Sequence, residues 1–246
     1  MSKTTKNNAP IDYKKSFLAK FRSLCSTRNA WEVWTDFITA SACAISNSTD
    51  RHSETTHNRE LMYQECIDRL GGIDTASSML SDVVMAFTTN PEQDFLGELF
   101  MSLNLGNHWE GQFFTPYHVC EMMAEINLHD ASDIIEKQGF VSINDCACGA
   151  GATLIAAANV LRKHNVNFQH HALFVAQDID RVAGMMCYIQ LSLLGCPGYV
   201  VIADSITNPV TGNVLYPDKH DGQEFWFTPM YGMLAIKQHL EGMKND

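Results

Sequence analysis

The chain lacks most of the features that would assign it at once. Its eight cysteines include no Cys-x-x-Cys pair, and its ten histidines show no metal-ligand spacing. Both absences argue against a disulfide framework and against structural zinc. No apolar run reaches the length of a membrane span, and no signal peptide is visible. We therefore expect a cytoplasmic protein with reduced thiols, no metal site and no contact with a membrane.

Positive charge is also scarce, with 17 Lys and Arg against 28 Asp and Glu, a net charge of −11. Seven of the 17 bases lie in residues 1–30, which hold a single acid, Asp12. Such a basic arm could contact phosphates, whereas an acidic body binds DNA poorly by itself. The alternative is an ordinary amphipathic first helix that carries Phe17 and Phe21. A partner subunit, or a protein that mimics DNA, stays open as an explanation of the charge.

The first hundred residues carry a helical pattern. Apolar residues recur at helical spacing in four segments, 31–42, 61–70, 75–87 and 95–103. The polar, Ser/Thr-rich segment 47–58 predicts a loop. A chain of 246 residues can form one or two domains. We predict a helical N-terminal region over residues 1–106 and an α/β domain over residues 107–246.

The most informative stretch runs from Asn144 to Leu154. There an apolar, β-prone segment leads into Asp-x-x-x-Gly-x-Gly, with an Ala-rich helical segment directly after it. Strand, glycine turn and helix open a nucleotide-type α/β fold, although glycines also occur in such turns for steric reasons alone. The position of a third glycine is Leu154, and no Lys-Ser/Thr follows, which argues against NAD, FAD and a P-loop. An acid at the strand end, Asp145, suits a cationic or zwitterionic ligand.

A second motif, Gly111-Gln-Phe-Phe-Thr-Pro116, ends 29 residues before Asp145. Together the two motifs resemble those of the N6-adenine DNA methyltransferases of type I restriction-modification systems, where both hold S-adenosylmethionine. Thr115 is a good N-cap and Pro116 a good first helical residue, so helix N–H groups would face the ligand. A capped helix with two core phenylalanines is the alternative. The cofactor residues implied by the resemblance are Gln112, Phe113, Phe114, Thr115, Pro116, Asp145, Cys146, Gly149 and Gly151.

Acidic residues also follow the next two predicted strands, 173–176 and 198–203. The resemblance implies that Asp178 binds the ribose hydroxyls of the cofactor and that Asp204 accepts a hydrogen bond from its adenine amine. A single Asp at a strand end more often caps a helix or a turn. Three at successive strand ends should converge on the crevice where open α/β sheets bind ligands.

The chain departs from the resembling family in the acceptor motif. Active members carry Asn/Asp/Ser-Pro-Pro-aromatic after the fourth strand, which grips the target amine and stacks on the flipped base. This sequence has no Pro-Pro. The segment 225–231 offers the best positional match, with Thr228, Pro229 and Tyr231 as candidate catalytic residues. A plain hydrophobic strand and turn is the alternative.

The segment after Tyr231 is short, with 15 residues that predict one helix over 234–243. The resemblance implies a Rossmann-like S-adenosylmethionine-dependent methyltransferase sheet, here with four strands in place of seven. A truncated sheet leaves an open edge, which the N-terminal helices or a partner must cover.

Three functions are compatible with these observations. The first is an S-adenosylmethionine-dependent DNA adenine-N6 methyltransferase of the restriction-modification type, which acts on double-stranded DNA with a specificity or other protein subunit. The second is a catalytically silent relative that binds the cofactor and serves as a regulatory or anti-restriction protein. The third, a small-molecule or protein methyltransferase, is disfavoured by the Gly-Gln-Phe-Phe-Thr-Pro string. Fold alone does not decide among them.

Overall fold

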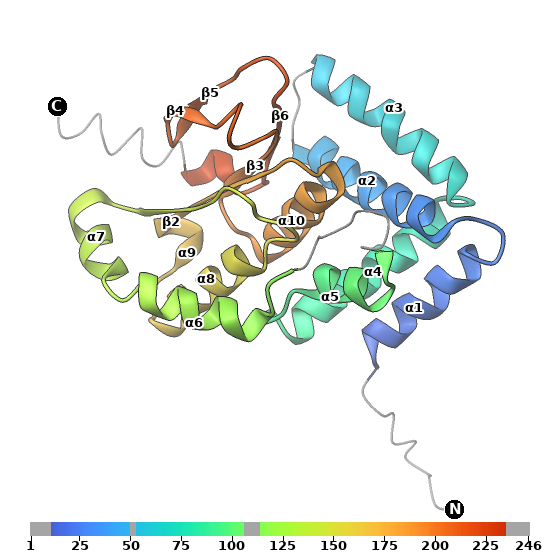
Figure 1. The fold of residues 1–246 in the computed structure, drawn as a ribbon, viewed down its shortest axis with the longest axis horizontal. Helices are drawn as coiled ribbons and strands as arrows, with labels where there is room; N and C mark the ends of the chain where they lie inside the picture. Colours follow the sequence, from blue (N-terminus) through green and yellow to red (C-terminus); the bar gives the residue numbers. More distant parts are fainter. Residues whose placement is uncertain (1–10, 50–52, 106–113, 235–246) are drawn as a thin grey trace, which may run out of the picture.

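The computed structural model describes residues 11–49, 53–105 and 114–234, without the side chains of 53–56. Figure 1 shows a central sheet with helices on one side and a small hairpin on the other. The described helices are α1 (Tyr13–Leu24), α2 (Ala30–Thr49), α3 (Ser53–Arg69), α4 (Ile73–Thr89), α5 (Phe95–Ser102), α6 (Tyr117–Asn127), α7 (Ala131–Gln138), α8 (Ala152–Lys163), α9 (Phe168–His171) and α10 (Arg181–Leu194). None of them is both long and apolar enough to cross a membrane.

The sheet confirms the predicted α/β class. The strands are β1 (Val141–Asp145), β2 (Ala172–Asp178), β3 (Gly198–Ile202), β4 (Thr211–Asn213), β5 (Tyr216–Asp218) and β6 (Glu224–Phe227). Four of them form one sheet in the order β1-β2-β3-β6. The first three are parallel, which requires the crossover helices α8 and α10 between them. β6 runs antiparallel to β3, so its end lies beside the start of β3.

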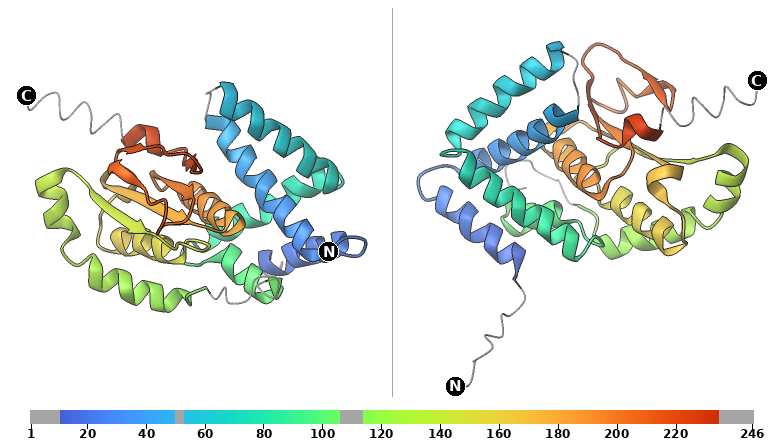
Figure 2. Two further views of the ribbon diagram at one scale, coloured as in Figure 1. Left: turned by 45° about the horizontal axis from the view of Figure 1, so that its top comes forward. Right: turned by 180° about the vertical axis from the view of Figure 1, so that it is seen from behind.

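The two faces of the sheet differ in their cover. On one face, α8 and α10 pack with the N-terminal helices into a single large hydrophobic core. On the other, a small cluster around Tyr199 and Phe225 lies beneath the β4–β5 hairpin and Leu234. Figure 2 shows the N-terminal helices gathered beside α10 at one side of the sheet. The predicted boundary between residues 106 and 107 falls in a stretch outside the described residues, and the division into two domains stays a proposal.

The predicted loop over 47–58 is wrong, because α2 continues to Thr49 and α3 begins at Ser53. The guanidinium of buried Arg59 explains the difference. It donates to Ser46 Oγ at 2.5 Å and to the Phe225 carbonyl at 2.6 Å, and it lies over the Trp226 ring. These tertiary contacts outweigh the low helix propensity of the Ser/Thr-rich segment. They also place α3 against β6.

The described part of the basic segment, residues 1–30, is largely the amphipathic helix α1, which was the alternative to an arm that contacts phosphates. Phe17 and Phe21 of α1 are buried against α2. Three bases have acidic partners within the chain: Lys14 with Glu98 at 3.1 Å, Lys20 with Asp82 at 2.7 Å and Arg28 with Asp36 at 2.6 Å. Lys3 and Lys6 lie outside the described residues. The described part of the segment therefore offers few free charges to DNA.

Candidate active site

The predicted glycine turn lies between β1 and α8. Gly149 and Gly151 both adopt positive φ, +53° and +96°, which side chains rarely tolerate. A Cβ at Gly149 would lie 3.0 Å from the Phe114 ring, and one at Gly151 would lie 2.8 Å from Cys187 Sγ. The turn is therefore closed against α10 on one side and against Phe114 on the other. Only glycine permits this approach.

Two of the predicted carboxylates hold the turn in shape. Asp145 accepts hydrogen bonds from the Ala147 N–H at 3.1 Å and from the Thr153 hydroxyl. Asp178, at the end of β2, accepts from the Gly149 N–H at 2.8 Å and from the Asp180 N–H at 2.8 Å. Burial raises the pKa of Asp178, although both N–H donors favour its charged form. The two carboxylates thus meet at one turn, as expected for acids at the ends of neighbouring parallel strands.

Phe114 and Thr115 bring the second motif to the same place. The Phe114 ring lies 5.2 Å from the ring of Phe100, which in turn contacts Trp34. Aromatic packing therefore links α2, α5 and the glycine turn. The residue before α6 is Pro116 and not Thr115, a shift of one position from the predicted cap. Gln112 and Phe113 lie outside the described residues.

A cavity of about 520 Å³ opens between α6, β1 and the glycine turn. Four predicted residues line it, namely Phe114, Thr115, Asp145 and Gly149. Its volume falls in the range of small-molecule sites. No Lys, Arg or His is among the described residues that line it. The cavity is therefore suited to a ligand that carries positive charge.

Four other predicted cofactor residues lie around the cavity without lining it. Pro116 directly precedes α6, Gly151 directly precedes α8, Cys146 is exposed on the turn, and Asp178 contacts Gly149. Asp204 lies farther along the sheet edge, where its carboxylate accepts from the Ile206 and Thr207 N–H groups. These hydrogen bonds lower its pKa. Asp204 thus stabilises its own turn, and its predicted adenine contact stays a prediction.

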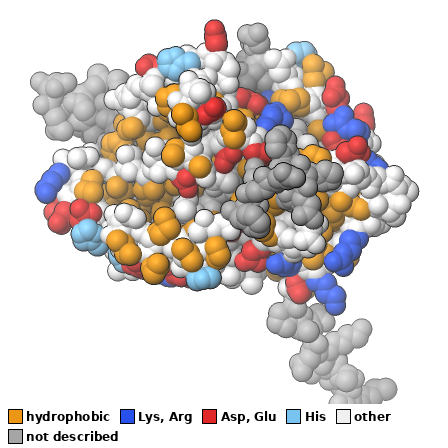
Figure 3. Space-filling view, in the orientation of Figure 1, with side chains coloured by type: hydrophobic (Ala, Val, Ile, Leu, Met, Phe, Trp, Pro, Cys, Tyr) orange, Lys and Arg blue, Asp and Glu red, His pale blue; other side chains and the backbone are white. Residues whose placement is uncertain are grey.

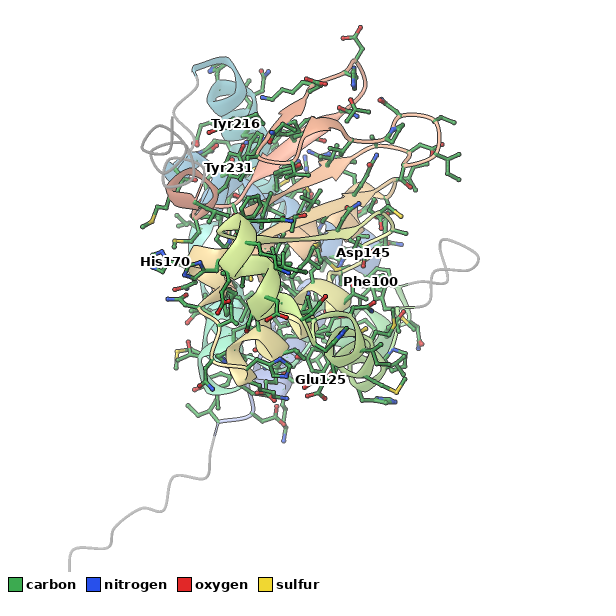
Figure 4. All side chains as sticks on the ribbon, turned by 90° about the vertical axis from the view of Figure 1, so that its left-hand side faces the viewer. Phe100, Glu125, Asp145, His170, Tyr216 and Tyr231 are labelled. Carbon is green, nitrogen blue, oxygen red and sulfur yellow. The ribbon has the colours of Figure 1, made fainter. Side chains whose placement is uncertain are left out.

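The structure does not bring Thr228, Pro229 and Tyr231 to this cavity. Because β6 is antiparallel, Thr228 lies beside Gly198, at the amino end of β3. The buried Thr228 hydroxyl donates to the Cys196 carbonyl at 2.7 Å and accepts from the Gly198 N–H at 3.0 Å. Tyr231 donates to the Leu215 carbonyl and packs on Phe227. Figure 4 shows Tyr231 well apart from Asp145. The predicted acceptor site is therefore corrected to a structural turn, which was the alternative.

One functional candidate, Asp94, was missed in the sequence. It is 4% exposed and lines the cavity, with Oδ1 accepting from the Gly97 N–H at 2.9 Å and from Gln190 Nε2 at 2.7 Å. Gln190 also donates to the Ala150 carbonyl at 2.8 Å. Asp94 is thereby connected to the glycine turn through one side chain of α10. The signal for Asp94 in the sequence is Gly97, a glycine inside the predicted helix three residues after it.

The described residues contain no group of three or more His, Cys, Asp or Glu that could hold a metal ion. S-adenosylmethionine, in contrast, fits the residues present. The glycine turn allows close approach of a backbone to a ligand, and carboxylates without neighbouring cations suit its sulfonium and ammonium charges.

Comparison with known proteins gives one family and two similar solved structures. A family profile described as N-6 DNA Methylase matches residues 96–221. Among solved structures, the chain is similar to the methyltransferase subunit of a type I restriction-modification system from Streptococcus thermophilus, with 12% identity and a TM-score of 0.42, over 80% of this chain and 59% of that one. It is also similar to a putative class I S-adenosylmethionine-dependent methyltransferase from Listeria monocytogenes, with 16% identity and a TM-score of 0.40, over 93% and 70%. No curated protein sequence matches.

The profile match decides the family, because residues 96–221 make up 126 of the 246 positions. They include α5 except Phe95, the Phe114–Pro116 segment, the glycine turn and the three parallel strands. The chain spans 59% of the length of the streptococcal subunit. This chain belongs to the N-6 DNA methylase family.

Proposed function

We propose that this chain binds S-adenosylmethionine in the cavity at the glycine turn and forms the cofactor-binding part of a DNA adenine-N6 methyltransferase of the restriction-modification type. The observation that carries the proposal is the joint position of Phe114, Thr115, Asp145 and Gly149 around one cavity of about 520 Å³. These residues come from motifs far apart in the sequence. Their convergence is what a shared ligand requires.

Each residue has a proposed role. S-adenosylmethionine supplies an activated methyl group on a sulfonium. Gly149 and Gly151 give it a close backbone surface, and Phe114 covers one side of that surface. Asp178, which contacts Gly149 of the cavity wall, would accept hydrogen bonds from ribose hydroxyls, because an ionised carboxylate has more acceptor sites than the two N–H groups use. Asp145 contributes negative charge while it fixes the turn.

We also propose double-stranded DNA and a further protein subunit as partners. Within the described residues, β1 pairs only with β2, so its other edge is open beside the cavity. The neighbouring helix α6 exposes Met122, Met123 and Ile126, and Figure 3 shows hydrophobic side chains along this part of the surface. Open strand edges and contiguous apolar surfaces are typical of interaction sites. A partner there would complete the site on the side of β1.

A catalytically silent cofactor-binding relative is the second candidate. The positions of Thr228 and Tyr231 favour it, because neither residue is among the described residues that line the cavity, where a flipped base would need to be held. We therefore propose weak or absent methylation of DNA by this chain alone. A partner subunit would restore methylation under the first candidate but not under the second.

Transfer of tritiated methyl groups to unmethylated DNA separates the two candidates. The assay is run with the chain alone and with the specificity and modification subunits of a type I system, added one at a time. Methylation that requires this chain, a partner and Asp178 supports the enzyme. Cofactor binding in every mixture, without methylation beyond that of the partner alone, supports the silent relative.

A further inference from the structure

We propose that Asp94 makes the cavity select the cationic cofactor, S-adenosylmethionine, over its neutral product, S-adenosylhomocysteine. The inference rests on the proposed function and assigns a specificity role to a residue outside both sequence motifs. It concerns the charge of the ligand and not its shape, since the two molecules differ by one methyl group and one positive charge.

The position of Asp94 is built by glycine and glutamine. A Cβ at position 97 would lie 2.0 Å from Asp94 Oδ2, so the carboxylate occupies space that only Gly97 leaves free. Gln190 fixes Oδ1 from the opposite side. Within the described chain no hydrogen bond reaches Oδ2, although the side chain is 4% exposed and lines the cavity. Oδ1 thus accepts two hydrogen bonds, and Oδ2 lies against Gly97 without a hydrogen bond from the described chain.

Helix capping does not explain the charge of Asp94. Asn and Ser cap helices about as well as Asp does, without a buried negative charge. Burial of an ionised carboxylate without a cation nearby is unfavourable. Burial therefore raises the pKa of Asp94. A ligand with positive charge would offset this cost. A carboxylate at this position, in place of an amide or a hydroxyl, is therefore better explained by binding than by folding.

The described lining of the cavity holds acidic groups without basic partners. Asp94 and Asp145 are the two acids among its described lining residues, which include no base. Cys120 also lines the cavity, and its thiol is affected by both acids. Burial raises the pKa of its thiol to about 11, and both carboxylates add to the shift. Coulomb interactions are stronger in such a partly buried site than in water.

Methyl transfer would change the ligand charge at this point. The methyl carbon forms a bond to the acceptor nitrogen as its bond to sulfur breaks, and the electron pair of that bond stays on sulfur. The nitrogen then loses its extra proton to solvent. S-adenosylmethionine, with net charge +1, thereby becomes a neutral thioether product. A cavity that favours the cation would bind substrate and release product.

Calorimetric titration of both ligands tests the inference in the full chain. We expect wild type to bind S-adenosylmethionine about tenfold more tightly than S-adenosylhomocysteine, as a single partly screened charge interaction allows. In Asp94→Asn, affinity for the cation should fall while affinity for the product stays within about twofold. Asp12→Asn is the matched control, since Asp12 caps α1 through the Lys15 N–H. The ratio of its affinities for S-adenosylmethionine and S-adenosylhomocysteine should equal that of wild type.

The failures are distinguishable. No binding of either ligand by folded wild type overturns the proposed cofactor site. Binding of both ligands with equal affinity by wild type, or an unchanged ratio in Asp94→Asn, overturns the role of Asp94 alone. An equal loss of both ligands in Asp94→Asn shows a structural effect through Gln190 and also overturns it. Asp94→Ser, which retains a capping hydroxyl, replaces Asp94→Asn if that variant does not fold.

Discussion

The two ends of the sheet use similar residue types for opposite purposes. At the carboxyl ends of β1 and β2, Asp145 and Asp178 hold a glycine turn beside a cavity lined by acids and by no described base. At the amino ends of β2 and β3, Thr228 is buried in backbone hydrogen bonds. A second cavity there, of about 620 Å³, is lined by Arg162 and by no described acid. Strand direction decides which residues can meet a ligand.

The comparison explains why a short motif can mislead. Thr-Pro-Met-Tyr after an aromatic strand has the order of an acceptor motif, yet an antiparallel strand delivers it to the wrong end of the sheet. Parallel strands bring their carboxyl ends to one crevice, where ligands bind. A motif in this fold has a functional meaning only together with the direction of its strand.

Asp178→Ala should have the largest effect, and at the cofactor end only. Loss of a hydrogen-bonding carboxylate costs about 1.5–3 kcal/mol of binding, roughly ten- to hundredfold in affinity. Calorimetry with S-adenosylmethionine measures it. Asp133→Asn, on the exposed surface of α7, is the control and should bind as wild type does. Equal affinity of wild type and Asp178→Ala would remove Asp178 from the site.

Thr228→Val should affect the opposite end. The substitution keeps the shape but leaves the Gly198 N–H without its side-chain acceptor, which costs about 1–3 kcal/mol of unfolding free energy. Denaturant unfolding measures the loss, and calorimetry on the same sample should show unchanged cofactor affinity. A variant of normal stability that binds cofactor normally but loses methyl transfer would return Thr228 to the acceptor site.

Gly149→Ala should have an intermediate effect on the turn. A residue with a Cβ pays about 1–2 kcal/mol at positive φ, and this Cβ would also press on the Phe114 ring. We expect roughly tenfold weaker cofactor binding, from the strain figure alone. Gly222→Ala is the control, because Gly222 also has positive φ and is not among the residues that line the cavity. A Cβ at Gly222 would lie 3.6 Å from the nearest atom, Asn208 Nδ2, which is an ordinary contact distance. Gly222→Ala should lower stability without lowering affinity.

Much of this architecture could be predicted from the sequence, because buried parallel strands are continuous apolar runs. Segments 173–176 and 198–203 lie within or overlap β2 and β3. The direction of β6 could not be predicted, since Phe225-Trp-Phe227 indicates a strand and nothing about its orientation. The β4–β5 hairpin was also missed, because its residues are mostly exposed and carry no alternating apolar pattern.

The site was predictable to the extent that it follows short motifs. Asp145, Gly149, Phe114 and Thr115 were found from two strings and their spacing. Asp94 was not, because its role depends on Gln190 from α10, 96 residues away in the chain. Such a contact leaves no local pattern. Arg59, which places α3 on β6, was missed for the same reason.

The smallest expected effect is a pH dependence from Asp94. Burial raises its pKa in the folded state above the ordinary value of 3.8, and hydrogen bonds from Gly97 and Gln190 offset part of that shift. A carboxyl with a raised pKa stabilises the fold below its unfolded pKa and loses that contribution as pH rises through the folded value. Asp94→Asn should therefore gain stability relative to wild type as pH rises from 4 to 7. Denaturant unfolding measures the free energy of unfolding of both proteins at each pH. A difference between wild type and Asp94→Asn that stays constant from pH 4 to 7 would contradict a buried charge at Asp94.

The central claim is that the glycine turn and the Phe114 segment together form an S-adenosylmethionine site. Isothermal titration of the folded, full-length chain with this ligand tests it most directly. The account predicts one site per chain with a dissociation constant in the micromolar range, about −8 kcal/mol. Absence of any heat with S-adenosylmethionine and with S-adenosylhomocysteine, on protein shown to be folded, would contradict it.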